Sequence, residues 1–561
     1  MHKQYIRFLG ILLTLTPLSS MHADTIPTAL KNDTLVKEAE AANIPKSPAP
    51  LPPFDSNKEV QVNEALLANS IIPKEGAPFS LQGAIAFTLQ NQISLQIERL
   101  NISISKGVLQ SSAAPFDYYL QASGEYIDQH NLLHSPLKTS KHGNETTGSA
   151  GATMRTRPGT SFAFEVGFDK TNDPFDAPPT DNTGFISFQV VQPLLRGFLY
   201  GVDWMQEKAD EYELYATYYD NFQAISQAIF NTANEYWGVV EAQKELLINR
   251  EAYKRIKELT TNIEELIKND QYARDDLYQP QQQMINYELN IIEAQQSLYA
   301  SLQSLKLAMG DISVCDFTEF PMSLTDDIVI PPLDTTDFHS QFMNYISYAT
   351  TYAYKIQAAT LRQIEAEILL TGATNDRLPT LDVVGGVSTH NFEIGERGKP
   401  LVSPLEMHRP QTNWNIGVNF SMPLYNDGPI GEWQQRRAEN AQAILAVQLA
   451  KQQLIASLRT ALFQQVSLKA ALNESEENVR ISRILFEGGV IQLQANMISL
   501  FDLISFEGRL TNALLQRVSI KTQYMQNIAL LRFLTSTIFK QTDDCDIIEL
   551  LNVSNLPDFR K

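Results

Sequence analysis

One junction occurs twice in this sequence, about 230 positions apart. Residues 188–197 read FQVVQPLLRG and residues 418–428 read VNFSMPLYNDG, so both pass from a strand-like segment through Pro-Leu to a glycine. A very long helical pattern follows each of them. The same features in the same order, a strand, Pro-Leu, a glycine and a long helix, predict an internal duplication in which each copy carries strands and a helical hairpin. The residues that mark these strand-to-helix junctions are Pro193, Gly197, Pro423 and Gly428.

The helical patterns are longer than a compact globular domain needs. Between Asp203 and Asn269 there is no proline, and apolar residues recur at three- and four-residue spacing. Tyr278–Met309 predicts a returning helix, so we expect an antiparallel coiled-coil hairpin with its tip near residues 269–276. In the second repeat, Glu432–Glu487 has heptad rows and neither glycine nor proline, and Met497–Leu534 is expected to return.

A shorter helix is expected before the strands of each repeat. Ser80 is a suitable N-cap for the first, which we expect to end near Ala114. Phe338–Gly372 predicts the second. Alternation of apolar and polar residues then predicts strands within 119–126, 161–168, 185–191 and 414–420.

The first strand region is longer than the second. It spans 78 residues from Pro115 to Pro193, against 44 residues from Pro379 to Pro423. The first repeat therefore carries either an enlarged loop or an extra hairpin, and the sequence leaves both alternatives open.

The N-terminus has the three-part layout of a secretory signal peptide. Lys3 and Arg7 precede an apolar run from Phe8 to Leu18, and Ala23 suits cleavage. We therefore expect residues 1–23 to be a signal peptide, residues 24–78 to be a flexible extension, and the mature protein to be exported. No other segment approaches 18 consecutive apolar residues, so a membrane role would rest on strands or on surface attachment.

Charge and motifs argue against several classes of function. The formal net charge is −20 and no basic stripe is present, so we expect no nucleic-acid partner. No phosphate-binding glycine loop or nucleophile elbow appears, so we expect no enzyme activity, no catalytic residue and no cofactor. His130, His134 and His142 lack a helical pattern and a carboxylate pair, which favours an exposed loop over a metal site. Cys315 and Cys545 occupy corresponding places in the two repeats, which argues against a disulfide.

Several motifs, in order, resemble the TolC-type outer-membrane efflux and secretion channel family, the outer membrane factors. FSLQGAIAFTLQNQISLQIERLNISISKGVLQSSAAPF looks like the opening of that family's repeat, and QPLLRG and MPLYNDG look like its strand-to-helix junction. RDDLYQPQQQMINYELNIIEAQQSLYASLQSLKLAMG and FDLISFEGRLTNALLQ look like its returning helix. The resemblance covers about residues 78–540.

The resemblance implies an α+β membrane protein with two repeats of long antiparallel helical hairpins joined to a few strands. Three identical chains would contribute four strands each to a 12-stranded β-barrel in outer-membrane lipid, with a helical tunnel across the periplasm. The implied function is a passive exit duct for efflux or type I secretion. A periplasmic adaptor would join it to an inner-membrane efflux pump or ABC transporter.

By analogy with the family, polar residues at the helical tips are candidates for a periplasmic gate. These candidates are Tyr272, Arg274, Asp275, Asp276 and Asp502. A solvated turn is the competing interpretation. Near the second tip, Gly488, Gly489 and Val490 are candidates for adaptor contact, and a plain helix terminus is the alternative.

The expected division of the chain after residue 78 is a first repeat at 79–310, an inter-repeat linker at 311–336, a second repeat at 337–540 and a tail at 541–561. An exported coiled-coil scaffold or adhesin without a pore is the rival function. Heptad rows fit both, whereas the duplicated junction between strands and long helices favours the channel.

Overall fold

The computed structural model describes residues 78–132, 140–172, 180–268, 274–310, 323–324, 338–394, 411–495, 497–541 and 548–550. All of them belong to one unit, residues 60–561. The expected signal peptide and nearly all of the expected extension, linker and tail lie outside the described residues. So do Tyr272, His134, Cys315 and Cys545.

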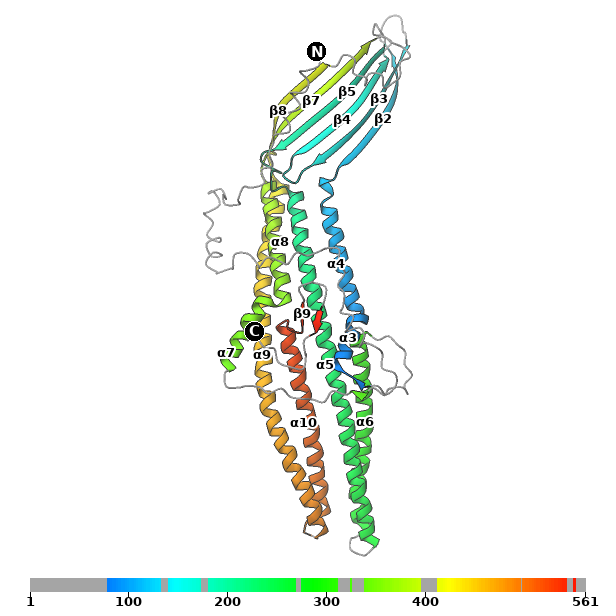
Figure 1. Cartoon of the computed structure of the whole chain (residues 1–561), viewed down its shortest axis with the longest axis vertical. Helices are drawn as coiled ribbons and strands as arrows, with labels where there is room; N and C mark the ends of the chain where they lie inside the picture. The colour runs from blue at the N-terminus through cyan, green and yellow to red at the C-terminus, as the bar shows by residue number, and fades with distance from the viewer. Residues whose placement is uncertain are drawn as a thin grey trace. The chain divides into compact units, whose positions relative to one another are not determined.

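The order of elements repeats along the chain (Figure 1). The first repeat has α3 (Leu81–Asn91), α4 (Ile93–Ser112), β2 (Tyr119–Leu132), β3 (Ser140–Arg155), β4 (Ser161–Asn172), β5 (Thr180–Pro193), α5 (Val202–Lys268) and α6 (Tyr278–Met309). The second has α7 (Phe338–Tyr352), α8 (Tyr354–Asp376), β7 (Thr380–Ile394), β8 (Gln411–Ser421), α9 (Asp427–Gln494) and α10 (Leu500–Leu534). Short elements are β1 (Pro78–Phe79), η2 (Ala114–Phe116), η3 (Arg274–Leu277), β6 (Ser323–Leu324), β9 (Phe539–Gln541) and β10 (Ile548–Leu550).

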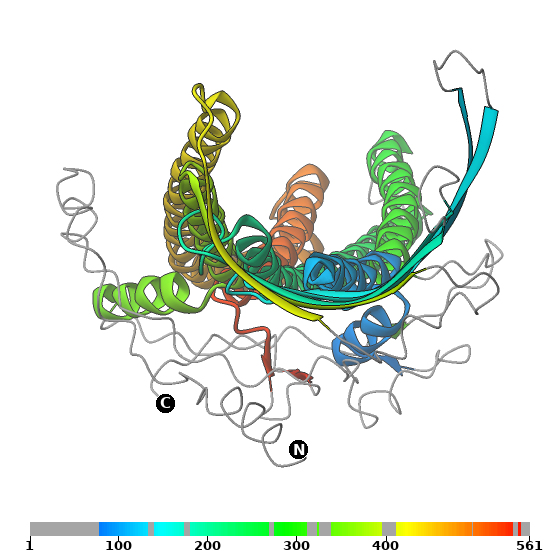
Figure 2. The same cartoon turned by 90° about the horizontal axis from the view of Figure 1, so that it is seen from above.

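The long strands form one antiparallel sheet of six in the order β2-β3-β4-β5-β7-β8. Figure 2 shows this sheet as an arc that runs from β8 to β2. The four strands per chain implied by the resemblance are therefore wrong for this protein. Of the two alternatives for the longer first strand region, the extra hairpin is correct, because the first repeat supplies four strands and the second supplies two.

Strand β3 was not predicted, because SKHGNETTGSAGATMR is rich in small residues and lacks apolar alternation. Gly148 of β3 instead makes room for an aromatic ring on β4, since a Cβ atom there would lie 2.6 Å from the ring of Phe168. Gly167 of β4 does the same for β5, since a Cβ atom there would lie 2.5 Å from the ring of Phe185. The expected loop around His130 and His142 is also wrong, since the register pairs these two residues across β2 and β3.

Helix α5 is the centre of the helical layer. Next to the sheet the helices pack in the order α4–α5–α8–α9, and toward the tips in the order α6–α5–α10–α9 (Figure 1). The largest core cluster lies where the two arrangements meet and includes Tyr236, Leu305 and Ile528, each at most 1% exposed. The predicted coiled-coil hairpins are confirmed as α5–α6 and α9–α10.

The shorter helix of each repeat is interrupted, a break that its apolar spacing does not predict. Ser80 caps α3 as expected, but Gln92 takes an extended conformation between α3 and α4. Ala353 does the same between α7 and α8. At the first break the chain touches Gly310, whose φ of +77° ends α6, and a Cβ there would lie 2.7 Å from Gln92 Cα. Close backbone approach thus fixes glycine at this position.

Candidate functional site

The sheet has one apolar and one polar face. Paired residues in an antiparallel sheet point to the same side, so the register assigns every residue to a face. Leu120, Ala152, Phe164, Phe188, Val387 and Trp414 form one continuous row of the apolar face across all six strands. The adjacent row is Gln121, Gly151, Glu165, Ser187, Ser388 and Asn413, on the opposite face.

No helix of the described chain covers the apolar side chains near the second junction. On β8, Trp414, Ile416, Val418 and Phe420 are 77%, 72%, 65% and 64% exposed. Large apolar side chains exposed in a continuous patch mark a contact with a lipid or protein surface. The six strands have between 11 and 16 residues. A strand of about 9–11 residues is enough to cross a bilayer core when it is tilted.

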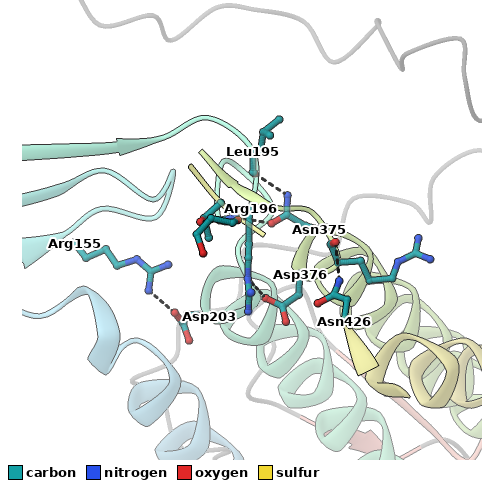
Figure 3. A network of polar contacts seen from close by, with 11 residues as sticks. Arg155, Leu195, Arg196, Asp203, Asn375, Asp376 and Asn426 are labelled. Atoms are coloured by element: carbon teal, nitrogen blue, oxygen red, sulfur yellow. Dashed lines mark hydrogen bonds and ion pairs between the residues drawn. The ribbon is translucent and has the colours of Figure 1, made fainter. Parts of the chain in front are cut away.

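The first strand-to-helix junction is fastened to the end of α8 (Figure 3). Arg196 Nε donates to Asp376 Oδ1 at 2.7 Å, and the Gly197 amide donates to Asn375 Oδ1 at 2.7 Å. Gly197 has φ +85°, a conformation that favours glycine. Pro193 is the last residue of β5 and pairs with Asp382. The junction therefore joins the first repeat to the second.

The second junction is built differently. Pro423 lies between β8 and α9, and Gly428 is already inside α9, where a Cβ would meet nothing within 4 Å. Leu424 and Tyr425 are 98% and 83% exposed. The side-chain Nδ2 of Asn426 donates to the backbone carbonyl of Arg377 at 3.0 Å (Figure 3). The predicted junction pair thus shares a position in the repeat but not a conformation.

The described gate candidates come from two separate elements, η3 and α10. Arg274 and Asp275 are exposed on η3, and Asp276 lies in the same short helix. Asp502 belongs to the capping box of α10: its carboxylate accepts from the Ser499 amide at 3.1 Å and the Ser499 hydroxyl at 2.6 Å. These hydrogen bonds hold the pKa of Asp502 below its usual value. Its local role is to begin a helix.

The adaptor-contact candidates lie inside α9, so the expected helix break at this position is wrong. Gly489 is buried, and a Cβ there would lie 2.8 Å from the Phe506 ring of α10. Gly488 is half-buried with open space in place of a Cβ, and Val490 packs partly against the apolar core near the tips. Gly489 thus lets the two helices of this hairpin approach closely.

A buried polar network links the two hairpins and was missed in the sequence. The carboxylate of Glu507 on α10 is fully buried and accepts from Arg255 Nη2 on α5 at 2.9 Å and from Thr511 Oγ1 at 2.8 Å. The Tyr287 hydroxyl on α6 donates to its other oxygen. Burial and the neighbouring carboxylate raise the pKa of Tyr287. A paired buried carboxylate of this kind fixes the relative placement of the elements that hold it.

A second charged cluster joins α5 to α8 closer to the sheet. Arg362 donates to Glu213 at 3.0 Å and to Asp220 at 2.6 Å. Burial raises the pKa of Glu365 to about 7, and the Glu213 carboxylate contributes to the same shift. This carboxyl therefore changes charge close to neutral pH.

A groove of about 420 Å³ lies between α5, α9 and α10, and the charged residues that line it include Lys244, Glu251, Arg483, Glu487 and Arg517. In the described ranges, no three His, Cys, Asp or Glu side chains gather as metal ligands would. Nor do those ranges contain a helix with the length and hydrophobicity to cross a lipid bilayer.

Comparisons with known proteins agree on the fold. No family model and no curated protein sequence matches the chain. Among solved structures, CusC, described as forming a transmembrane channel, is 14% identical with a TM-score of 0.59 and covers 87% of this chain and 98% of its own. The CmeC outer membrane channel of Campylobacter jejuni is 15% identical with a TM-score of 0.58, covering 88% and 95%. The MtrE outer membrane channel of Neisseria gonorrhoeae is 14% identical with a TM-score of 0.57, covering 82% and 89%.

Identities this low establish the architecture and leave activity to be argued from this chain's own residues. The first two matches span nearly the whole length of the channels, so the shared architecture includes both the sheet and the helical hairpins. The expected resemblance is thereby confirmed: this chain has the fold of the TolC-type outer-membrane channels.

Proposed function

We propose that three copies of this chain form a channel in the outer membrane that is a passive exit duct with no catalysis of its own. The observation that carries the proposal is the sheet with one apolar and one polar face, joined directly to helices of 67 and 68 residues. A helix rises about 1.5 Å per residue, so each of these would extend roughly 100 Å beyond the sheet. That length suits a tunnel across the periplasm.

The two faces of the sheet support a wall between lipid and water. Transmembrane strands alternate between apolar side chains toward lipid and polar side chains toward a lumen. In this sheet Ile416 and Val418 belong to the apolar face, whereas Asn415 and Asn419 belong to the polar face. A scaffold or adhesin with a soluble sheet would instead have to cover the apolar face.

Both lateral edges of the chain have features of an interface between copies. The outer strands of the described sheet are β2 and β8, and open strand edges are not tolerated in lipid. The helical layer ends at α4 on the same side as β2 and at α9 on the same side as β8. Exposed apolar residues occur on both helices, including Leu100 and Ile104 on α4 and Leu449 on α9. A ring of identical copies would cover these edges.

We further propose that the Glu507 network holds the two hairpins together in a closed duct, and that a periplasmic adaptor acts on the tips. The groove between α5, α9 and α10 lies beside this network, because Arg255 contributes to both. Gly488 and Val490 remain candidates for adaptor contact, and the exposed tip residues Arg274 and Asp275 remain candidates for the periplasmic gate. Energy would come from an inner-membrane efflux pump or ABC transporter, and the duct would serve efflux or type I secretion.

The proposal is tested with the full chain extracted in mild detergent from isolated outer membranes. Native mass spectrometry is expected to give a trimer, and planar-bilayer recordings are expected to give discrete conductance steps. A monomer recovered from the soluble fraction, without conductance, would contradict the channel and favour the scaffold or adhesin.

A further inference from the structure

We propose that the membrane wall of this channel has eighteen strands, because each of three copies contributes all six strands of its sheet. In this arrangement β8 of one copy pairs with β2 of the next. The inference rests on the proposed trimeric channel and concerns how its wall is closed. It differs from the 12-stranded wall that four strands per chain would give.

The chain itself contains a template for the contact between copies. Strand β5 is the last strand of the first repeat and β7 is the first long strand of the second, and they pair antiparallel from Asp181–Ile394 to Pro193–Asp382. In the duplicated plan, β8 corresponds to β5 as the last strand before a long helix. Likewise β2 corresponds to β7 as the first strand after a short helix. The pairing of β8 with β2 of the next copy therefore repeats a contact already made inside the chain.

Strand direction and side-chain faces permit this closure. Six strands that alternate in direction leave β2 and β8 antiparallel, so successive copies continue the same hydrogen-bond pattern. The apolar face is formed by even-numbered residues on both strands, including Leu120 on β2 and Phe420 on β8. Pairing of even with even positions keeps this face continuous around the ring, whereas a slip of one residue would reverse it.

The widths of the two layers favour the inclusion of all six strands. Strands about 4.8 Å apart and tilted by roughly 40° each occupy about 6 Å of a wall, so six of them occupy about 37 Å. The four helices that adjoin the sheet, at about 9 Å each, occupy about 36 Å. The sheet can therefore continue the helical wall without narrowing. Four strands would occupy only about 25 Å.

A wall of this size changes what can leave the duct. Barrel diameter grows roughly in proportion to strand number, so eighteen strands give a wall about 1.5 times as wide as twelve. Walls of 16–18 strands enclose a water-filled channel. The exit through the membrane would then be similar in width to the helical tunnel.

Disulfide trapping tests which strand lies next to β8. Cys315 and Cys545 are first replaced by serine in the full chain. Asn419→Cys on β8 is then combined with Gln121→Cys on β2 or, as the matched control, with Glu165→Cys on β4.

Gln121 and Glu165 both pair with Gly151, so they lie in one row on the polar face. Strand β8 is three strand spacings, about 14 Å, from β4 in its own chain, which exceeds the reach of about 7 Å between Cα atoms. Trapped disulfides therefore link separate copies. Because the repeat fixes the neighbouring strand more firmly than its exact offset, Ser123→Cys is paired with Asn419→Cys in parallel.

For at least one of the two pairs with a β2 cysteine, we expect disulfide-linked dimers and trimers and no larger species. For the pair with Glu165→Cys on β4, we expect no disulfide-linked species. A ladder through Glu165→Cys would overturn the inference, because β2 and β3 would then lie outside the wall. A ladder through β2 that ends at the dimer would also overturn it, since two copies give twelve strands. Conductance of the cysteine-free parent protein separates the two proposals. A conducting trimer linked through β4 contradicts only the eighteen strands, whereas a protein without conductance contradicts the channel itself.

Discussion

Arg255 on α5 and Glu507 on α10 are 252 positions apart in the sequence and form a bifurcated ion pair, with Nε and Nη2 3.2 and 2.9 Å from the same carboxylate oxygen. Tyr287 and Thr511 occupy further acceptor positions of the carboxylate. The pair connects hairpin α5–α6 to hairpin α9–α10, and the Glu507 side chain is fully buried there. It is therefore a polar contact that helps to fix the relative position of the two hairpins.

The first prediction concerns this ion pair. Arg255→Met leaves the Glu507 charge buried without its cation, and loss of one partner of a buried pair typically costs about 3–5 kcal/mol. We expect a lower midpoint of thermal unfolding and a higher basal conductance of the isolated protein. The matched control is Arg480→Met, which removes an exposed ion pair with Glu477 on α9. If the Arg255→Met protein has unchanged stability and unchanged basal conductance, the proposal that the Glu507 network holds the duct closed is contradicted.

The second prediction concerns pH and Glu365. Its pKa of about 7 in the folded protein lies above the ordinary 4.5, because burial and the nearby Glu213 disfavour its charge. The folded state therefore binds more protons than the unfolded state between these two values. This group's contribution to stability is present below pH 4.5 and is lost as pH rises through about 7.

Glu365→Gln removes this dependence. Relative to the parent protein, the variant is expected to gain thermal stability at pH 8 and not at pH 4.5. Glu367→Gln, two residues further along α8 and exposed, is the control. The measurement compares the thermal unfolding midpoints of the parent protein and both variants in detergent at both pH values. An equal effect of Glu365→Gln at both would show that Glu365 titrates normally.

The helical part of the fold was readable from the sequence because its signal is long and local. The run from Asp203 to Asn269, without proline and with regular apolar spacing, predicts α5 to within one residue at each end. The predicted Glu432–Glu487 finds α9 but falls short of both its ends, at Asp427 and Gln494. Strand β3 could not be read in this way, since its residues are small and polar. It becomes a strand through pairing with β2 and β4, whose own alternation is clear.

The polar network shows a second limit of sequence reasoning. Arg255, Tyr287 and Glu507 come from three helices, and the sequence does not tell which helices meet. One signal was present: Glu507 falls in the buried row of Leu503, Leu510 and Leu514, where a charge is costly unless it is paired. Asp502 also had a readable role, because Ser499 three residues earlier completes a capping box.

The third prediction separates the two junction glycines. Gly197 has φ +85°, and a residue with a Cβ atom costs about 1–2 kcal/mol in that region. Gly428 lies in α9 with open space around it, and alanine there should stabilise the helix by up to about 1 kcal/mol. Melting temperatures should therefore fall for Gly197→Ala and stay equal or rise for Gly428→Ala. The same loss for both would mean that the two junctions have one conformation.

The last prediction uses two neighbouring residues on opposite faces of β8. Ile416 belongs to the apolar face and is 72% exposed, whereas Asn415 is exposed on the polar face. If lipid covers the apolar face, Ile416→Lys places a charge in hydrocarbon at a cost of about 2–4 kcal/mol near the bilayer midplane. Asn415→Lys would place the same charge toward water in the lumen. The amount of trimer that detergent extracts from isolated outer membranes should therefore fall for Ile416→Lys. It should stay unchanged for Asn415→Lys. Equal assembly of both variants would mean that water contacts both faces of the sheet, and a strong defect only in Asn415→Lys would mean that the lipid-facing side has been assigned the wrong way round.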